Sequence, residues 1–322
     1  MLILSEALAR RLVGIDDAID AVAATFRAMA EGQARNYPVV REVVGLNDAV
    51  FGVKAGGDIS APFLGLKAGG YWPGNMAKGI GNHQSSTLLF DPATGRAAAL
   101  VSANYLTGIR TGAASALATR CLAREEASVL GIIGTGGQSP HQLAATARVR
   151  GLTRVHGWDA SLNAAARFGE TVAALGLDYV AETDPQAVAA AADIIITVTP
   201  SQKPILQRSW IRPGTHISAM GADTKGKQEL EPALVAAARL FVDEVAQSIS
   251  IGEFQHAYAA GLIRPEALIP LGAVLAGSAA GRQSAEEVTI FDGTGVALQD
   301  LVIAELAWRK ALESGEGWVV DY

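Results

Sequence analysis

The stretch VLGIIGTGGQS, residues 129–139, decides the fold. Its first half is an apolar run typical of a buried β-strand, and its second half is a glycine-rich turn that leads into a helical pattern. Backbone N–H groups and the positive end of the helix dipole converge at such a turn, which suits the pyrophosphate of a dinucleotide. The residues expected to hold the dinucleotide here are Gly134, Thr135, Gly136, Gln138 and Ser139.

Asp159 supports this prediction and selects the cofactor. It ends the next predicted strand, RVHGWD, about twenty residues further on, where a carboxylate can accept hydrogen bonds from the adenosine ribose and repel a 2′-phosphate. NAD is therefore expected rather than NADP. The alternative is that Asp159 only caps the helix that follows it. Thr197 and Thr199, in TVTPS, close a later strand at its carboxyl end and complete the expected cofactor set.

The chain around this segment alternates between strand and helix patterns. Runs such as Ile194–Val198 are apolar without alternation, as in parallel strands that are covered on both faces. This predicts a doubly wound α/β, Rossmann-type domain over residues 121–299. Residues 1–120 start with a helical pattern over Ser5–Gly32, with the glycine as its stop, and continue with short strands. They predict an α+β substrate-binding domain into which the Rossmann-type domain is inserted, completed by a C-terminal helix over 300–322.

Composition excludes several kinds of partner. The 322 residues are 50% hydrophobic, with a net charge of −6 and no dense Lys/Arg cluster, so neither nucleic acid nor an anionic membrane is an expected partner. The first residues form neither a signal sequence nor a membrane-spanning segment, and a single cysteine, Cys121, fits a reduced, cytoplasmic protein. The five histidines show no metal-ligand spacing, so no metal is expected.

Several basic side chains stand where an ion is costly. Lys67, in GLKAGGYWPGN, and Arg110, in LTGIRTGAASALA, lie among small or apolar residues. Lys67 either reaches water or has an anionic partner, and Arg110 needs a carboxylate, from a ligand or from a structural ion pair. Arg41 and Lys54 raise the same choice, with a solvent-exposed side chain as the alternative. His83 is a candidate for substrate contact or a structural histidine.

Asp223 follows the predicted strand HISAM and so falls at the carboxyl edge of the sheet, where ligands of open α/β folds bind. It is expected to meet the nicotinamide side of the cofactor, and the alternative is a turn-forming role. Lys225 and Lys227, in the same segment, are interpreted as solvated surface charges.

Together these motifs resemble the ornithine cyclodeaminase/mu-crystallin family over nearly the whole chain. The similar segments are GLKAGGYWPGN, LTGIRTGAASALA, GIIGTGGQS, MGADTKGKQELEP and FDGTGVALQDL. The resemblance implies that Arg41, Lys67 and Arg110 contact the carboxylate of a small anionic imino or amino acid. It also implies that Asp223 is the catalytic acid or base, and that the protein is a homodimer joined through the substrate domain.

Within the family, segments such as GYWPGN, NHQSSTLLFDP and DEVAQSISIGE are most similar to iminosuccinate reductases, which form L-aspartate with NADH. This implies hydride transfer to an imine carbon, with Asp223 acting on the imine nitrogen and Lys67 holding the carboxylate or passing a proton. Lys54, His83, Gln84 and Ser85 become candidates for contact with a second carboxylate. Diamine-handling members need an acid near the distal amine, and Asp58 is the one acid near Lys54. The alternatives left open are an ornithine cyclodeaminase, an alanine dehydrogenase, a cyclic ketimine reductase and a non-catalytic, mu-crystallin-like ligand-binding protein.

Overall fold

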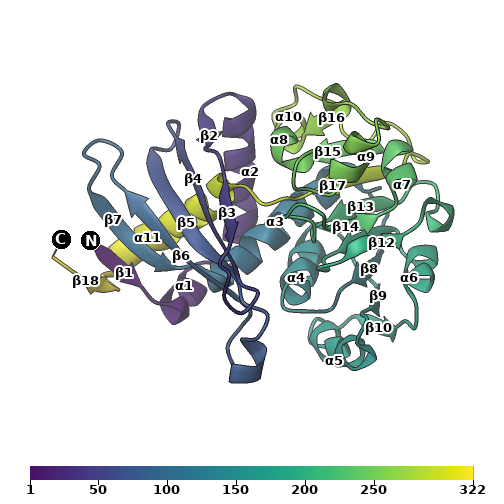
Figure 1. Cartoon of the computed structure of the whole chain (residues 1–322), viewed down its shortest axis with the longest axis horizontal. Coiled ribbons are helices and arrows are strands. Elements are labelled where there is room, and N and C mark those ends of the chain that lie inside the picture. The colour runs from purple at the N-terminus through teal and green to yellow at the C-terminus, as the bar shows by residue number, and fades with distance from the viewer. Residues whose placement is uncertain (322) are drawn as a thin grey trace. The chain divides into compact units, whose positions relative to one another are not determined.

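A computed structural model describes residues 1–321, and the chain divides into two compact units (Figure 1). Unit 1 comprises Met1–Arg110 and the segment from Val296 onward, and unit 2 comprises Thr111–Gly295. These boundaries lie before the expected ones after residues 120 and 299. The first boundary falls inside a continuous helix, α3 (Asn104–Leu122), so no break in the sequence pattern marks it.

Unit 1 is built on one eight-stranded sheet. Its strands are β1 (Leu2–Leu4), β2 (Ala34–Asn36), β3 (Val40–Val43), β4 (Val50–Asp58), β5 (Phe63–Tyr71), β6 (His83–Phe90), β7 (Ala97–Ser102) and β18 (Trp318–Val319). Its helices are α1 (Glu6–Leu12), α2 (Ile15–Ala30), the first part of α3, α11 (Ala297–Ser314) and the 3-10 turn η1 (Met76–Lys78). The strands follow the order β18-β1-β7-β6-β5-β4-β2 with β3 beside β4, and every pair is antiparallel except β1 with β7.

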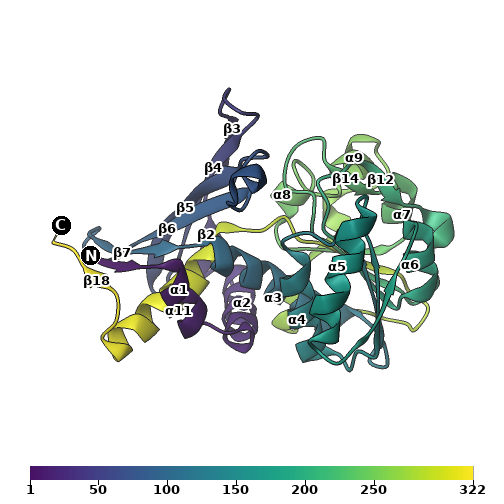
Figure 2. The ribbon, with the colours of Figure 1, turned by 90° about the horizontal axis from the view of Figure 1, so that it is seen from below.

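Figure 2 shows α1, α2 and α11 on one face of this sheet. The N-terminal helical pattern over Ser5–Gly32 forms two helices, α1 and α2. Gly14 has an extended backbone between them, and its N–H donates to the Asp17 carboxylate at 3.0 Å, which caps the start of α2. Gly32 ends the pattern as expected, with a left-handed φ of 72°.

Unit 2 holds the expected doubly wound α/β fold. Its strands are β8 (Val129–Ile133), β9 (Arg154–Trp158), β10 (Asp178–Ala181), β11 (Ile194–Thr197), β12 (Gln202–Leu206), β13 (His216–Ala219), β14 (Gln228–Leu230), β15 (Arg239–Val242), β16 (Leu268–Pro270) and β17 (Thr289–Asp292). Its helices, besides the end of α3, are α4 (Ser139–Val149), α5 (Leu162–Ala173), α6 (Pro185–Ala191), α7 (Pro232–Ala236), α8 (Val245–Ser248), α9 (Gln255–Ala259), α10 (Leu271–Leu275) and the 3-10 turns η2 (Arg208–Trp210) and η3 (Pro265–Ala267).

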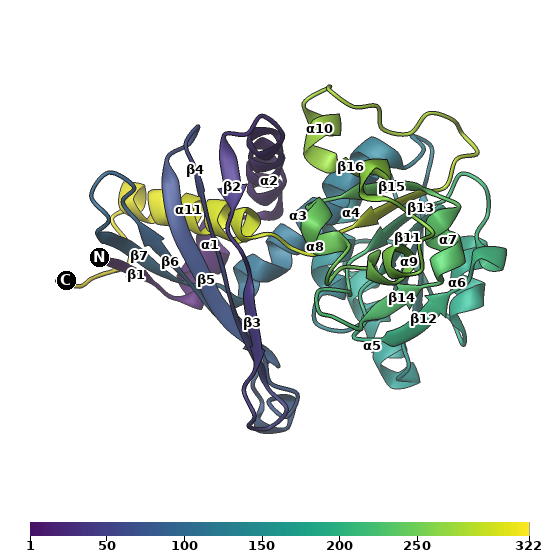
Figure 3. The ribbon, with the colours of Figure 1, turned by 45° about the horizontal axis from the view of Figure 1, so that its top comes forward.

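The main sheet of unit 2 is parallel throughout, in the order β10-β9-β8-β11-β13-β17-β15-β16. Helices flank it on both sides, with α4 on one side and α6 and α7 on the other (Figure 3). Every residue of β11 is buried, which explains the unbroken apolar run. The chain direction of the crossovers reverses between β8 and β11, and ligands of such folds bind at the carboxyl ends of the strands beside that point.

The C-terminal helix belongs to unit 1, as expected, but it is shorter than the range 300–322. It ends at Ser314 because Gly315 adopts a left-handed φ of 70°, and the chain then forms β18 against β1. The expected last residue, 322, lies outside the described residues. Among residues 1–321, no helix combines the length and the apolar character needed to cross a membrane.

Candidate active site

A buried ion-pair cluster joins β5, α3 and α11 in unit 1. The Nζ atom of Lys67 lies 2.8 Å from one carboxylate oxygen of Asp300, and Nε of Arg110 lies 2.9 Å from the other. The three residues are only 7%, 7% and 3% exposed, for lysine, arginine and aspartate. Lys67 is therefore paired rather than directed to water, and Arg110 has the structural ion pair that the sequence left open as an alternative.

The register of the sheet places the other predicted basic residues on the same face as Lys67. Lys54 is the direct cross-strand partner of Lys67. Arg41 and His83 pair with residues an even number of positions away from Lys54 and Lys67 on the same strands. Because paired side chains share a face and alternate side chains return to it, Arg41, Lys54, Lys67 and His83 all project from the face that carries α11. All but Lys67 are half-buried.

Two glycines allow α11 to pack close enough to the sheet to place Asp300 beside Lys67 and Arg110. A Cβ atom on Gly65 would lie 3.0 Å from Leu301, and one on Gly56 would lie 3.2 Å from Leu298. Both glycines lie on the Lys67 face of β4 and β5. Larger residues at these positions would hold α11 away from the sheet and separate the carboxylate from the cations.

Burial in this cluster, together with the neighbouring charges, shifts the pKa of both Lys67 and Asp300. The pKa of Lys67 is lowered to about 7, mainly because burial disfavours the charged amine; Arg110 and Lys54 lower it as well, against the raising effect of Asp300. Burial alone raises the pKa of Asp300, but Arg110, Lys67 and Lys54 outweigh it and hold that pKa at about 2. The Asp300 carboxylate thus pairs directly with Lys67 and Arg110, and the charge of Lys54 also stabilises its ionised form.

Asp300, Gln299 and Thr107 are the members of this cluster that sequence reasoning missed. The Nζ atom of Lys67 donates to the Thr107 hydroxyl at 3.3 Å, and Arg110 donates to the Gln299 side-chain oxygen at 3.1 Å. A signal was present for Asp300, because it occupies the buried stripe of α11 together with Ala297, Leu301 and Ala304. A carboxylate on the buried stripe of a helix needs a cation to pair with it.

Asp58, the one acid near Lys54 in the sequence, forms hydrogen bonds within its own turn. It is 5% exposed, and one of its carboxylate oxygens accepts the Ser60 N–H at 2.7 Å, the Ser60 hydroxyl at 2.6 Å and the Ala61 N–H at 3.1 Å. Its role is to shape the turn after β4. One of its two carboxylate oxygens is therefore engaged by its own turn.

The glycine-rich turn of unit 2 has the form expected for a dinucleotide site. Gly134 has a φ of +97°, and a Cβ atom there would lie 2.8 Å from both the Val198 carbonyl and Thr199. Cβ atoms on Gly136 or Gly137 would meet nothing within 4 Å, so these glycines border free space where a ligand can approach the backbone. The buried Ser139 side chain stabilises the turn by donating a hydrogen bond to the Gly136 carbonyl at 2.7 Å.

Asp159 is tied to this turn. One carboxylate oxygen accepts the Thr135 N–H at 2.9 Å, and the other accepts the Ser161 N–H at 2.8 Å. The N-cap of α5 is Ser161, whose hydroxyl accepts the Ala164 N–H, so the alternative in which Asp159 is the cap is wrong. A carboxylate can accept about four hydrogen bonds, and the half-buried Asp159 keeps capacity for a ribose.

The carboxyl ends of β11 and β13 carry the remaining candidates. Asp223 is half-buried, and it accepts a hydrogen bond from Lys227 at 2.7 Å. Lys227 is therefore an ion-pair partner rather than the solvated charge expected, because the loop after β13 folds back and brings the two side chains together. Thr199 donates its N–H to Glu229, and Thr197 is fully buried with its hydroxyl directed at the same carboxylate.

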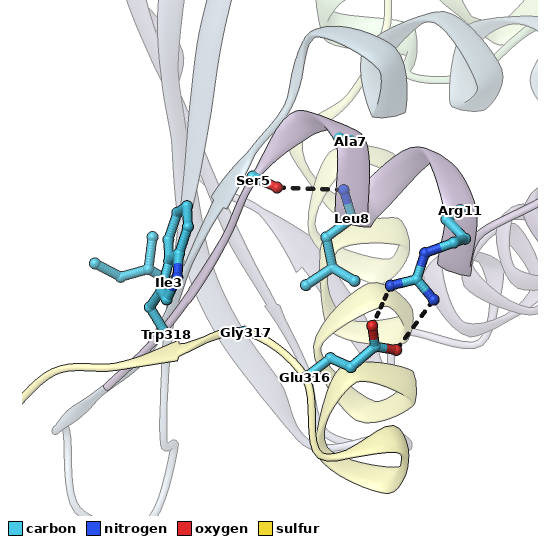
Figure 4. Close-up of a pocket in the computed structure, with 8 residues that line it drawn as sticks. All are labelled: Ile3, Ser5, Ala7, Leu8, Arg11, Glu316, Gly317 and Trp318. Atoms are coloured by element: carbon cyan, nitrogen blue, oxygen red, sulfur yellow. Dashed lines mark hydrogen bonds and ion pairs between the residues drawn. The ribbon is translucent and has the colours of Figure 1, made fainter.

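A surface groove of about 390 Å³ runs between β1, α1 and the C-terminal segment, but it has little chemistry (Figure 4). Its charged groups are Arg11 and Glu316, which neutralise each other in an exposed ion pair. Within residues 1–321, no group of His, Cys, Asp and Glu side chains is arranged to hold a metal ion. The chemistry of the described residues is therefore concentrated in the cation cluster of unit 1 and the strand ends of unit 2.

Comparisons with known proteins agree with this architecture. Residues 2–315 match the model of the ornithine cyclodeaminase/mu-crystallin family. The iminosuccinate reductase of Paracoccus denitrificans (strain Pd 1222) is 50% identical over 321 residues, which is 100% of both chains. Its crystal structure in complex with NAD+ gives a TM-score of 0.95 and covers 100% of this chain and 99% of that one.

Two further solved structures are similar over almost their whole length. Thermococcus litoralis Delta(1)-pyrroline-2-carboxylate reductase, in complex with NADH and L-proline, is 30% identical, with a TM-score of 0.96 and coverage of 99% of this chain and 100% of that one. An archaeal alanine dehydrogenase dimer with bound NAD is 34% identical, with a TM-score of 0.94 and coverage of 100% and 99%. The chain, as its motifs predict, belongs to the ornithine cyclodeaminase/mu-crystallin family.

Proposed function

We propose that this protein is an NADH-dependent imine reductase that converts iminosuccinate to L-aspartate. The observation that carries the proposal is the cluster of basic groups on one face of unit 1, where Lys67 and Arg110 pair with the carboxylate of Asp300 and the charge of Lys54 acts on both Lys67 and Asp300. An imine with two carboxylates is complementary in charge to this basic face. The 50% identity to an iminosuccinate reductase supports this substrate over an imine with one carboxylate.

Unit 2 is assigned to the cofactor. When bound, NADH supplies a hydride from C4 of its nicotinamide ring. The N–H groups of the turn from Gly134 to Ser139 hold the pyrophosphate, and Thr135 and Gln138 belong to this turn. Asp159 accepts hydrogen bonds from the adenosine ribose. Thr197 and Thr199 shape the neighbouring loop at the end of β11. A cytoplasmic location is part of the proposal, because NADH is regenerated inside the cell.

Unit 1 is assigned to the substrate. Arg110 and Arg41 hold the carboxylate beside the imine carbon, for which a guanidinium offers two parallel donors. Lys54 and His83 bind the second carboxylate. Lys67 balances the substrate charge and, with a pKa of about 7, can also pass a proton. Asp223 acts as the acid or base at the imine nitrogen, which gains a proton while its carbon receives the hydride, so that the C=N bond becomes an amine.

The proposal is tested by following NADH absorbance with oxaloacetate plus ammonia, which form iminosuccinate in solution, and with pyruvate plus ammonia. We expect NADH oxidation with the four-carbon acid and the appearance of L-aspartate. The matched control is Asp223→Asn, which should bind NADH but not turn over. Faster oxidation with pyruvate, or conversion of ornithine to proline, would instead favour another activity of the family.

Replacing Asp159 by alanine is expected to raise the KM for NADH about tenfold or more and to narrow the preference for NADH over NADPH. The change removes an acceptor of ribose hydrogen bonds, each worth about 1.5–3 kcal/mol for a charged group, and a charge that repels a 2′-phosphate. Steady-state kinetics with both cofactors measure it. Asp178→Ala is the control, since Asp178 forms an exposed ion pair with Arg154 in the same sheet. Equal kinetics in the two variants would remove Asp159 from the cofactor site.

A homodimer joined through unit 1 is part of the proposal. The sheet face opposite Lys67 carries a row of cross-strand neighbours that are apolar and half-buried: Ile3, Leu100, Leu88 and Leu66. Figure 2 shows the helices of unit 1 on the other face only. An apolar sheet face is stabilised when a partner covers it. The archaeal alanine dehydrogenase, which is a dimer, has the same fold.

Placing a charge in this row is expected to produce a monomer. Leu88→Glu puts a carboxylate at the centre of the face, where burial in a dimer costs several kcal/mol by the usual penalty for an unpaired ion. Size-exclusion chromatography with light scattering gives the mass. Leu262→Glu, at an exposed leucine of unit 2, should leave the mass unchanged. An unaltered dimer in Leu88→Glu would place the interface elsewhere.

A further inference from the structure

We propose that Glu229, a residue outside every predicted site, is a positioning residue for the nicotinamide half of the cofactor site. This inference rests on the assignment of unit 2 to a nicotinamide dinucleotide. The Glu229 side chain lies at the carboxyl ends of two neighbouring parallel strands, β11 and β13. It is fully buried.

The Glu229 carboxylate ties together the loops that follow these strands. One oxygen accepts the Thr199 N–H at 2.6 Å. The other accepts the Thr197 hydroxyl at 2.7 Å and the Gly221 N–H at 2.9 Å. Two of these donors belong to the end of β11, and the third lies two residues before Asp223. A single carboxylate thus fixes both loops that border this part of the sheet.

The two loops and the Glu229 carboxylate meet in a closely packed region, which we call the Glu229 junction. A Cβ atom on Gly221 would lie 2.3 Å from the Thr199 carbonyl and 2.6 Å from the Glu229 carboxylate. Glycine at this position lets the two loops and the carboxylate meet. The Glu229 side chain therefore sets the distance between the two loops as well as accepting their hydrogen bonds.

Glu229 is itself held by a second buried carboxylate. Glu253 is 1% exposed, and its oxygens accept the backbone N–H of Glu229 at 2.9 Å and that of Leu230 at 2.6 Å. Burial raises the pKa of both side chains, and in Glu253 the charge of Glu229 raises it further. Two desolvated carboxylates whose charges repel each other are unfavourable for stability, which points to a role other than simple packing.

The order of the strands indicates which half of the cofactor this junction serves. Asp159 and the glycine-rich turn follow β9 and β8, where the adenosine and the pyrophosphate bind in this fold. The strands β11 and β13 lie on the other side of β8, so the loops that Glu229 holds face the remaining mononucleotide half. The loop after β13 carries Asp223, the proposed catalytic acid or base.

The test compares two ligands by calorimetry in Glu229→Gln: NADH, and ADP-ribose, which lacks the nicotinamide. The amide keeps the size of the side chain, but its NH2 group faces an N–H or O–H donor where the carboxylate had an acceptor. We expect the Kd for NADH to rise about tenfold, while the Kd for ADP-ribose changes by less than about twofold. We also expect kcat to fall, because the loop that carries Asp223 is no longer fixed.

Glu231→Gln is the matched control. Glu231 lies two residues away, and its carboxylate accepts the Arg208 N–H at 2.7 Å, a bond that the amide oxygen preserves. It should bind both ligands as the wild type does. If Glu229→Gln does not fold, Thr197→Val removes a single hydroxyl donor from the same junction and should give the same selective loss in smaller measure.

Equal weakening of NADH and ADP-ribose, or no weakening of either, would overturn the role of Glu229. Neither result depends on turnover. Absence of iminosuccinate reduction by the wild type, by contrast, would count against the proposed substrate while leaving the two-ligand comparison intact.

Discussion

Replacing Lys67 by methionine is expected to lower kcat/KM for imine reduction about a hundredfold or more, because proton transfer and charge balance at the substrate both depend on this amine. Methionine fills a similar volume, and Asp300 keeps its ion pair with Arg110, so the fold should persist. Steady-state kinetics together with thermal unfolding separate the two effects. A near-normal kcat/KM would remove Lys67 from the mechanism. Lys203→Met, at an exposed lysine of unit 2, is the control.

The pH dependence of the same variant provides an independent signature. If the protonated amine is the active form, kcat/KM of the wild type falls as the pH rises through about 7, the pKa of Lys67, and this limb is absent in Lys67→Met. The free energy of unfolding changes with pH in the opposite direction to kcat/KM. Between pH 7 and 10.5 the unfolded chain keeps a proton that folded Lys67 has lost, so the free energy of unfolding rises with pH across this window.

Replacing Asp300 by asparagine is expected to lower the free energy of unfolding by about 3–5 kcal/mol, the usual cost of removing one partner from a buried ion pair. The change leaves Lys67 and Arg110 without their carboxylate. Lysine can respond by losing its proton, but the guanidinium stays charged at any accessible pH. Urea unfolding at pH 7 measures the loss, which is a large part of the total stability of an ordinary domain.

Two further variants test the origin of this loss. Glu305→Gln is the control on the same helix, because Glu305 pairs with the exposed Arg309 and should contribute less than about 1 kcal/mol. The double variant Asp300→Asn/Lys67→Met removes one of the uncompensated cations, so part of the lost stability should return. If Asp300→Asn is as stable as the control, the ion-pair cluster contributes nothing to folding.

The pKa of the Asp300 carboxylate also predicts how the stability of the protein changes in acid. The pKa of Asp300 in the folded chain is about 2, below its ordinary value of 3.8. Its stabilising contribution is therefore fully present above pH 3.8 and is lost as the pH falls through about 2.

The sequence by itself determined the elements whose information is local. The apolar strand, glycine-rich turn and helix start at residues 129–139 predicted the doubly wound fold, because each depends on neighbouring residues. The spacing of Asp159 from that turn predicted that it lies beside the turn, where its carboxylate accepts the Thr135 N–H. The need of Arg110 for a carboxylate also followed from its apolar surroundings alone.

Tertiary structure decided which groups meet. The carboxylate that pairs with Arg110 lies 190 residues away, and its arrival beside Lys67 depends on two glycines that let α11 approach β4 and β5. The Lys227 ion pair and the Glu229 junction depend in the same way on how loops fold back over the strand ends. Periodicity records which face a residue occupies, whereas ion pairs and hydrogen bonds form only where packing brings distant segments within about 3 Å of each other.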